Sequence, residues 1–162
     1  MMTELWDLYD GERKRTGNVI SRNSPIPNGL FHISVSVWIR NSKGQYLISQ
    51  RHSQKTYPLY WECTGGSIIS GEDSLAGAVR EVKEELGIYL NPLGGKIIYQ
   101  TCRTKTKDFY DVWLFFKDLD IEEICLQDKE VIDVKWVDRG ELVKMYNDGK
   151  LHPLIDYINI LP

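Results

Sequence analysis

The sequence predicts an α+β fold or a sandwich built on a mixed β-sheet, in a single domain of 162 residues. Residues 31–40 alternate apolar and polar side chains with period two, which is typical of a strand with one buried face. Residues 72–87 instead carry apolar side chains at helical spacing. The other strand-like and helical segments lack the regular alternation of a parallel βαβ fold, so we expect a mixed sheet.

The predicted elements follow one another in a simple order along the chain. Residues 1–29 form an N-terminal extension, in which 6–9 is a short strand and 13–29 is irregular because glycines and prolines interrupt it. Residues 117–129 are predicted to be an acidic loop between two strands. The remaining strands are predicted at 45–50, 61–63, 96–105, 109–116 and 131–137, and the remaining helices at 139–147 and 153–160.

The helix predicted within residues 72–87 has marked ends and an apolar stripe. Asp73 or Ser74 is expected to cap its N-terminus, and Gly87 to end it. Gly77 lies in the helix interior, where glycine costs about 0.5–1 kcal/mol relative to alanine, so we expect a close contact there. The stripe that should face the core consists of Leu75, Ala78, Val79, Val82 and Leu86.

Three glutamates lie beside that stripe. Glu81, Glu84 and Glu85 are spaced i, i+3 and i+4, so a helix places them on one face. Hard divalent cations bind all-oxygen surfaces of this kind, and Mg²⁺ uses one or two carboxylates together with substrate phosphates. We therefore expect Glu85 to face solvent and a metal ion. For the three glutamates alone, a solvated acidic helix face is the alternative interpretation.

The spacing around the glutamates is more specific than the glutamates themselves. It runs from Gly66 over five residues to Glu72, and over seven more to the run Arg80-Glu81-Val82-Lys83-Glu84-Glu85-Leu86-Gly87-Ile88. Residues 66–88 match the Nudix box, Gly-x5-Glu-x7-Arg-Glu-U-x-Glu-Glu-x-Gly-U with U apolar, at every specified position. Such a match is expected by chance in about one of a billion windows. The chain therefore resembles the Nudix hydrolases.

This resemblance implies a fold, a reaction and a set of residue roles. The fold is an α/β/α sandwich, a mixed β-sheet between helices, with residues 66–88 as a loop–helix–loop unit. The reaction is hydrolysis of a nucleoside diphosphate linked to another moiety, with Mg²⁺ or Mn²⁺ as the cofactor. Glu72 and Arg80 are expected to pair and hold the loop against the helix. The implied metal ligands are Glu81, Glu84, Glu85 and the carbonyl of Gly66, and Glu81 and Glu85 also count as catalytic.

Many Nudix hydrolases take a further acidic residue from a loop distant from the box. Glu130 lies where such a residue often occurs, just before the strand predicted at 131–137, and is our candidate for a catalytic base on a mobile loop. Glu81 is the alternative general base. The competitors of Glu130 are Glu122, Glu123 and Asp128, for which a solvated surface position is the alternative interpretation.

Cationic and aromatic side chains are the candidates for substrate binding. Arg51, Lys55, Arg103 and Lys105 are candidate phosphate contacts, and an ordinary surface position is the alternative for each. The aromatic residues Tyr57, Tyr60 and Trp61 would stack on a base or lie in the core. The substrate stays open between a nucleoside di- or triphosphate, a nucleotide sugar, a dinucleotide polyphosphate and ADP-ribose.

Residues 30–61 carry a second resemblance, to the type 1 isopentenyl-diphosphate isomerases and the Nudix hydrolases similar to them. His32 falls where those isomerases place a metal-binding histidine. They have Cys-Gly-His after the tryptophan, whereas Trp61 is followed here by Glu-Cys-Thr-Gly-Gly-Ser, so Cys63 is out of register with the catalytic thiol. An isomerase is the first alternative function. A non-catalytic nucleotide-binding domain, which the intact glutamates disfavour, is the second.

The composition limits which binding partners and which cellular compartment are expected. The net charge of −3 provides no basic surface for nucleic acid. No apolar run reaches about 18 residues, so no membrane span is expected. Cys63, Cys102 and Cys125 are an odd, scattered set, which fits free thiols in a reducing compartment. We expect a cytoplasmic protein that binds a small nucleoside diphosphate derivative, with a homodimer as the further expectation for its assembly.

Overall fold

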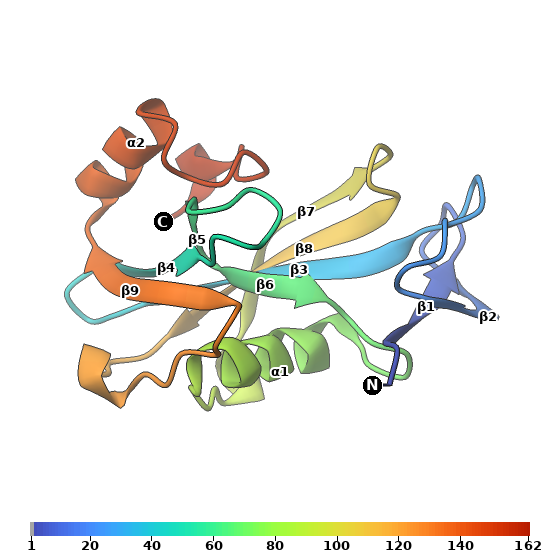
Figure 1. Cartoon of the computed structure of the whole chain (residues 1–162), viewed down its shortest axis with the longest axis horizontal. Helices are drawn as coiled ribbons and strands as arrows, with labels where there is room; N and C mark the ends of the chain where they lie inside the picture. The colour runs from blue at the N-terminus through green and yellow to red at the C-terminus, as the bar shows by residue number, and fades with distance from the viewer. Residues whose placement is uncertain (1) are drawn as a thin grey trace.

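β3 (His32–Arg40) is the central strand of the structure, a computed structural model that describes residues 2–162. The odd-numbered apolar residues of β3 pack with α1 (Ser74–Leu86) in one core, and Trp38 packs with α2 (Arg139–Asn147) in a second. The two helices thus lie on opposite faces of one sheet (Figure 1). This arrangement confirms the α/β/α sandwich, although β3 is buried on both faces rather than on one.

The sheet is mixed, as predicted, because its central strand has neighbours of both orientations. β3 runs parallel to β8 (Asp108–Phe116) and antiparallel to β6 (Thr64–Ser67). The strand order is β5-β4-β3-β8-β7, with β6 beside β3 and β9 beside β4. The other strands, all close to their predicted ranges, are β4 (Tyr46–Arg51), β5 (Trp61–Glu62), β7 (Lys96–Arg103) and β9 (Val131–Val137).

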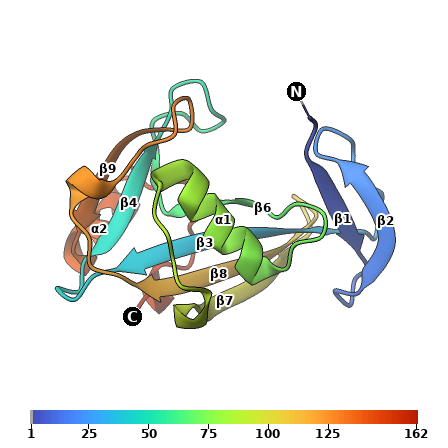
Figure 2. The same cartoon turned by 90° about the horizontal axis from the view of Figure 1, so that it is seen from below.

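The sheet opens between β3 and β4, and this opening positions the candidate site. The two strands pair only at Arg40 and Tyr46, next to the turn that joins them, and diverge beyond it (Figure 2). β6 takes the place of β4 beside the first half of β3, where Gly66 pairs with Val35. Because α1 packs against both β3 and β6, its glutamates lie at the edge of the opening.

The N-terminal extension contains a strand that sequence patterns do not mark. β2 (Arg15–Ser21) pairs with β1 (Leu5–Tyr9) in a separate two-stranded sheet at one end of the molecule (Figure 2). The prediction that residues 13–29 are irregular is therefore wrong for β2. Most of its side chains are exposed, so no alternation of apolar residues identifies it. Asp7 holds the hairpin to the box loop by accepting a hydrogen bond from Ser70 Oγ (2.7 Å).

α1 begins and ends where the sequence predicts. The Asp73 carboxylate accepts a hydrogen bond from the Ala76 N–H (2.8 Å), and Gly87 has a φ of 68°, the left-handed conformation that favours glycine. The predicted apolar stripe lies in the core. The expected close contact at Gly77 is present, since a Cβ there would lie 2.3 Å from Ile68 Cγ2.

The helix predicted at 153–160 is wrong, apart from a short 3₁₀ turn at Ile158–Ile160. The segment is tied to β5 instead, because the His152 N–H donates to the Trp61 carbonyl (2.8 Å). Its buried apolar residues on the α2 side of the sheet are Ile155, Tyr157, Ile158 and Leu161. Further 3₁₀ turns lie at Pro92–Gly94 and at Ile121–Glu123, the latter within the acidic loop. Within residues 2–162, no helix has the length and apolar character needed to cross a membrane.

Candidate active site

Arg80 joins the loop and the helix of the box. Its guanidinium donates to both carboxylate oxygens of Glu72, at 2.7 Å from Nε and 3.1 Å from Nη2, so the expected pair is present. Nη2 also donates to the Ser67 carbonyl (3.2 Å) at the end of β6. Nη1 donates to Glu81 (2.9 Å) and to Glu84 (3.0 Å). One cation therefore holds the loop against α1 and compensates part of its acidic face.

Glu81 lies against the backbone of Gly66. A Cβ on Gly66 would lie 2.6 Å from the Glu81 carboxylate carbon, so glycine is needed for β6 to approach this side chain. The Glu81 side chain is only 14% exposed. Burial raises the pKa of Glu81 to about 7, although the Arg80 guanidinium acts in the opposite direction. The box thus brings a backbone segment and a desolvated carboxylate together, as a shared set of metal ligands requires.

Glu85 is buried more deeply than the sequence suggests. Only 6% of the residue is exposed, so the expectation that it faces solvent is wrong. The last part of the acidic loop covers this end of α1, where the Gln127 N–H donates to the Glu85 carbonyl (2.9 Å). Lys55, from the loop after β4, lies over the carboxylate with Nζ 4.0 Å from Oε1. Burial raises the pKa of Glu85 well above its ordinary value, and the Lys55 charge offsets only part of this shift.

Glu130 lies at the same site. Its carboxylate forms an ion pair with Lys55, which therefore stands between Glu130 and Glu85. The His52 N–H donates to the Glu130 carbonyl (3.0 Å), so the loop after β4 is joined to the start of β9. The prediction that Glu130 is a catalytic base requires its carboxylate to lie near the carboxylate face of α1. Lys55, which contacts both Glu130 and Glu85, links Glu130 to that face.

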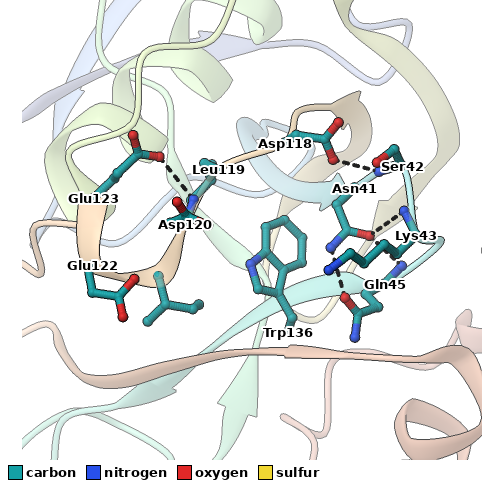
Figure 3. A pocket seen from close by; sticks show the side chains of 11 residues that line it. Asn41, Ser42, Lys43, Gln45, Asp118, Leu119, Asp120, Glu122, Glu123 and Trp136 are labelled. Atoms are coloured by element: carbon teal, nitrogen blue, oxygen red, sulfur yellow. Dashed lines mark hydrogen bonds between the residues drawn. The ribbon is translucent and has the colours of Figure 1, made fainter.

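The competitors Glu122 and Glu123 lie elsewhere. They line a cavity of about 600 Å³ next to Trp136, at the turn between β3 and β4 (Figure 3). Trp136 and Val131 lie near opposite ends of β9, which separates this cavity from the α1 site by about 16 Å along the strand. Glu123 accepts a hydrogen bond from the Asp120 N–H (2.9 Å), so its carboxylate stabilises its own turn.

The donor set of the box fits a hard divalent cation. The three box glutamates come from one helix, and the Gly66 backbone lies against Glu81. Carboxylate and carbonyl oxygens are the ligands that Mg²⁺ and Mn²⁺ take in proteins. Among residues 2–162, no three acidic, histidine or cysteine side chains converge in a metal-ligand arrangement; Arg80 and Lys55 compensate the carboxylates instead. A metal ion would offset the same charges.

A cavity of about 390 Å³ begins at Gly66 and extends along the α2 side of β3. Three of the four predicted phosphate contacts, Arg51, Lys55 and Arg103, line it, and Lys105 is not among its lining residues. Sequence reasoning missed its other charged or polar lining residues, which include Arg22, Ser34, Glu62, Asp108 and His152. Glu62 could have been noticed in the sequence, because it is a charged residue within a short apolar strand. The others come from segments that meet only in the folded chain, so no local pattern marks them.

Arg51 organises the loop that carries Lys55. Its Nη1 donates to both oxygens of Glu62 (2.8 and 3.0 Å). Nε donates to the carbonyls of Thr56 (2.9 Å) and Tyr57 (3.1 Å), and Nη2 donates to Thr56 as well (2.6 Å). A positive φ at Tyr57 (55°) bends the loop at this point. These contacts fix the position of Arg51 at the cavity, and its contact with a phosphate stays a prediction.

The three aromatic candidates for base stacking have partners within the chain. Tyr57 and Tyr60 lie beside His152, with 4.7 and 6.4 Å between ring centroids. Lys135 Nζ lies 4.9 Å from the centroid of the Trp61 ring. Burial and nearby cations, Arg51 foremost, lower the pKa of His152 to about 4, so this imidazole is neutral at neutral pH. Stacking of a base on these rings stays a prediction.

His32 and Cys63, the two residues that bear on the isomerase alternative, both contribute to the lining of this cavity but are packed within the fold. Cys63 is 3% exposed, burial raises the pKa of its thiol to about 12, and Sγ lies 4.0 Å from Tyr157 Oη. His32 stacks on Trp6 of the N-terminal hairpin, with ring centroids 4.1 Å apart. Burial lowers the pKa of His32, and its Nδ1 is buried without a hydrogen-bond partner in the described chain. Cys63 is thus a core thiol and His32 a packed strand histidine.

Known proteins resemble this chain in sequence and in fold. The NUDIX domain family matches residues 30–157. An uncharacterised Nudix hydrolase of Listeria monocytogenes is 36% identical over 154 residues, covering 93% of this chain and 89% of the relative. The isopentenyl-diphosphate Delta-isomerase of Escherichia coli is 27% identical over 151 residues, covering 89% of this chain and 82% of the isomerase. A solved structure from Deinococcus radiodurans matches with a TM-score of 0.77 at 22% identity, covering 96% of this chain and 98% of its own, and supports the fold alone.

Proposed function

The chain belongs to the Nudix hydrolase family, and on this premise we propose where its reaction takes place. As a Nudix pyrophosphohydrolase, it cleaves a nucleoside diphosphate linked to another moiety, X. We place the reaction at the acidic face of α1, with Mg²⁺ or Mn²⁺ held by Glu81, Glu84, Glu85 and the Gly66 carbonyl. The observation that carries this proposal is the low exposure of Glu81 beside the Gly66 backbone, together with the burial of Glu85 on the same helix.

The residues of the chain have distinct roles in this proposal. When bound, the cation offsets the charge of the diphosphate and acidifies a water molecule. Glu81 lies mostly out of solvent beside the Gly66 backbone, and its role is that of a further metal ligand or of the general base that takes a proton from this water. Glu130 is the second candidate base, once Lys55 turns from it to the substrate phosphates. Arg80 keeps the loop and the helix in register.

Glu130→Gln is expected to lower kcat more than it raises KM, because an amide cannot accept the proton but still fits beside Lys55. Glu122→Gln and Glu123→Gln should leave both constants nearly unchanged, since these residues line the separate cavity. Steady-state kinetics of the three variants with one substrate makes the comparison. Unaltered kinetics of Glu130→Gln would remove Glu130 from the mechanism and leave Glu81 as the general base.

Glu81→Gln is expected to stabilise the metal-free protein, and more so as the pH rises from 4.5 to about 7. In this range the unfolded chain releases the Glu81 proton while the folded chain keeps it, because burial raises the folded pKa to about 7 from an ordinary 4.5. The titration of Glu81 therefore lowers the free energy of unfolding of the wild-type protein by on the order of 3 kcal/mol, and the variant does not have this loss.

Chemical denaturation of both proteins at pH 4.5 and pH 8 without metal measures this difference. Burial lowers the pKa values of His32 and His152, so their titration makes the folded protein more stable as the pH rises, opposite to the effect of Glu81. Both histidines are present in both proteins, so their contribution to stability cancels in the comparison. Added Mg²⁺ should stabilise the wild-type protein at pH 8 more than the variant. A stability difference that does not change with pH would show that Glu81 is not desolvated.

Cys63→Ser is expected to leave hydrolysis within a few-fold of the wild-type rate. The thiol is buried in the core and holds its proton, so it cannot act as a nucleophile. Initial rates with Mg²⁺, together with a circular dichroism spectrum, provide the check. The isomerase would replace the hydrolase as the preferred function if the folded variant were inactive and the wild-type protein interconverted isopentenyl and dimethylallyl diphosphate.

A panel of substrates tests the proposed function directly. It contains nucleoside di- and triphosphates, nucleotide sugars, a dinucleotide polyphosphate and ADP-ribose, each with and without Mg²⁺. We expect Mg²⁺-dependent release of a nucleoside monophosphate from at least one of them. Isomerisation of isopentenyl diphosphate without cleavage of any panel member would favour the isomerase, and tight binding without turnover would favour the non-catalytic domain.

We further propose a cytoplasmic protein, because Cys63, Cys102 and Cys125 are all free thiols. Its ligand is a small nucleoside diphosphate derivative rather than nucleic acid, in keeping with the net charge of −3. A homodimer stays a prediction for the assembly, and multi-angle light scattering of the purified protein would check it.

A further inference from the structure

The cavity beside the box extends from the box to Arg103. Gly66 and Lys55 line the end next to the box glutamates, and Arg103 and Thr106 line the other. The backbone of Arg103 on β7 lies three strand spacings, or about 14 Å, from Gly66 on β6, but its guanidinium reaches back over Tyr110 to Ser34 of β3, the strand next to β6. A diphosphate held by the box glutamates therefore brings the group attached to it within reach of Arg103.

Arg103 is held rigidly and keeps one nitrogen free. Nε and Nη2 both donate to the Asp108 carboxylate, and Nη2 donates to Ser34 Oγ (3.1 Å). The guanidinium carbon lies 3.9 Å from the centroid of the Tyr110 ring, which fixes the plane of the group. Within residues 2–162, Nη1 donates no hydrogen bond, and the side chain is 21% exposed. Nη1 is therefore a preorganised donor at the far end of the cavity.

The charges around the cavity favour an anionic ligand. Four basic and two acidic side chains line it, a net charge of +2 with both histidines neutral. The free Nη1 of Arg103 can donate a charge-assisted hydrogen bond to a carboxylate oxygen of such a ligand.

The aromatic residues that line the cavity do not favour a nucleobase. Three aromatic residues line it, and each has a partner: Arg103 covers one face of Tyr110, Trp6 is stacked on His32 with 5° between the ring planes, and Tyr57 lies beside His152 with 4.7 Å between ring centroids. A base would have to compete with these partners for a stacking surface. The nucleoside half of the substrate is therefore better placed outside this cavity, and the cavity is left for the other half.

We propose that this cavity holds X, and that Arg103 selects an X that carries a carboxylate, as in a nucleotide sugar acid. The inference rests on the proposed function, because the diphosphate must lie at the box for X to reach Arg103. Arg103 is then a specificity-determining residue: its Nη1 donates to the carboxylate of X, while Asp108 and Tyr110 hold the guanidinium in place.

Binding of two matched sugar phosphates tests the proposal without any need for turnover. Glucuronic acid 1-phosphate and glucose 1-phosphate differ only in the carboxylate, and calorimetric titration in Mg²⁺ compares them. We expect the wild-type protein to bind the acid about tenfold more tightly or better, the effect of one hydrogen bond to a charged group. Equal affinity for the two ligands would overturn the inference.

Variants identify Arg103 as the cause of the preference. Arg103→Met alone would leave Asp108 buried and uncompensated, so the test uses the double variant Arg103→Met/Asp108→Asn, which keeps the pair neutral. The preference should disappear in this variant, and persistence would contradict the proposal. Lys105→Gln, on the same hairpin but outside the cavity lining, is the matched control and should keep the preference. Should the double variant not fold, Arg103→Lys should weaken the preference, and an unchanged preference would contradict the role of Arg103.

Hydrolysis separates this inference from the proposed function. Mg²⁺-dependent cleavage of UDP-glucuronate with a higher kcat/KM than UDP-glucose supports both. Cleavage of the two with equal kcat/KM leaves the proposed function standing and removes the inference. Failure to cleave any nucleoside diphosphate derivative removes the proposed function, and the inference falls with it.

Discussion

Glu85→Gln is expected to lower kcat by on the order of a hundredfold or more at saturating Mg²⁺, comparable to the loss of a main electrostatic stabiliser. The amide keeps the size of the side chain but removes the negative charge that a cation needs as a ligand. Glu85 is buried at the edge of the sheet opening, so water cannot replace the lost oxygen charge. Steady-state kinetics with the best substrate of the panel measures the effect.

The same substitution should not harm the metal-free fold. Burial disfavours the charged form of Glu85, as its raised pKa shows, so a neutral amide at this position is tolerated at pH 8. The thermal midpoint of metal-free Glu85→Gln should therefore equal or exceed that of the wild-type protein. Glu123→Gln, in the separate cavity, is the control for a lost carboxylate and should keep full activity. Near-normal turnover of Glu85→Gln would contradict its assignment as a metal ligand.

Arg80→Ala is expected to lower the free energy of unfolding by about 3 kcal/mol, a typical cost of leaving part-buried charges without their partner. The guanidinium is 19% exposed, and its partners Glu72 and Glu81 are 16% and 14% exposed. Its removal leaves both carboxylates desolvated and also frees the Ser67 carbonyl. Denaturant unfolding of the variant in the absence of metal measures the loss.

Two further variants show whether this loss comes from the network. Lys83→Ala removes a cation from the same helix but outside the box contacts, and should change stability by about 0.5 kcal/mol or less. Arg80→Ala/Glu72→Gln should recover part of the loss, because a neutral amide does not require the guanidinium. An Arg80→Ala protein as stable as the wild type would mean that the loop is held by other contacts.

The sequence was most informative where partners lie close together along the chain. The ends of α1 at Asp73 and Gly87, and the shared face of its glutamates, depend on residues within a few turns of one another, and a helix converts sequence distance directly into position. The pair of Arg80 with Glu72, which lies before the helix, was instead expected from the resemblance to the Nudix box. The arrangement of the box could therefore be predicted in part from helix geometry and in part from that resemblance.

The surroundings of the box could not be predicted, because they come from distant segments. The burial of Glu85 depends on Lys55, which follows β4, and on Gln127 and Glu130, which precede β9. These segments meet only because β4 pairs with β9 and diverges from β3. A helical wheel shows that the glutamates share a face but not what covers it, so the expectation of a solvent-facing Glu85 was wrong.

Two elements were assigned incorrectly for opposite reasons. β2 was missed because its side chains are mostly exposed and show no apolar alternation, although its backbone pairs with β1. The segment 153–160 has apolar residues that suggest a helix, but they are buried in a mostly irregular chain. In both cases backbone hydrogen bonds to another strand, the neighbouring β1 for β2 and the distant β5 for the C-terminal segment, decide the structure, and the side-chain pattern does not report them.

The central claim, that the acidic face of α1 binds the divalent cation, is tested most directly by titration with Mn²⁺ followed by electron paramagnetic resonance. This measurement needs neither a known substrate nor turnover. We predict that the wild-type protein and Glu123→Gln bind Mn²⁺ with the same affinity, and that Glu85→Gln binds it about tenfold more weakly or worse. Equal Mn²⁺ affinity of the wild-type protein and Glu85→Gln would contradict it.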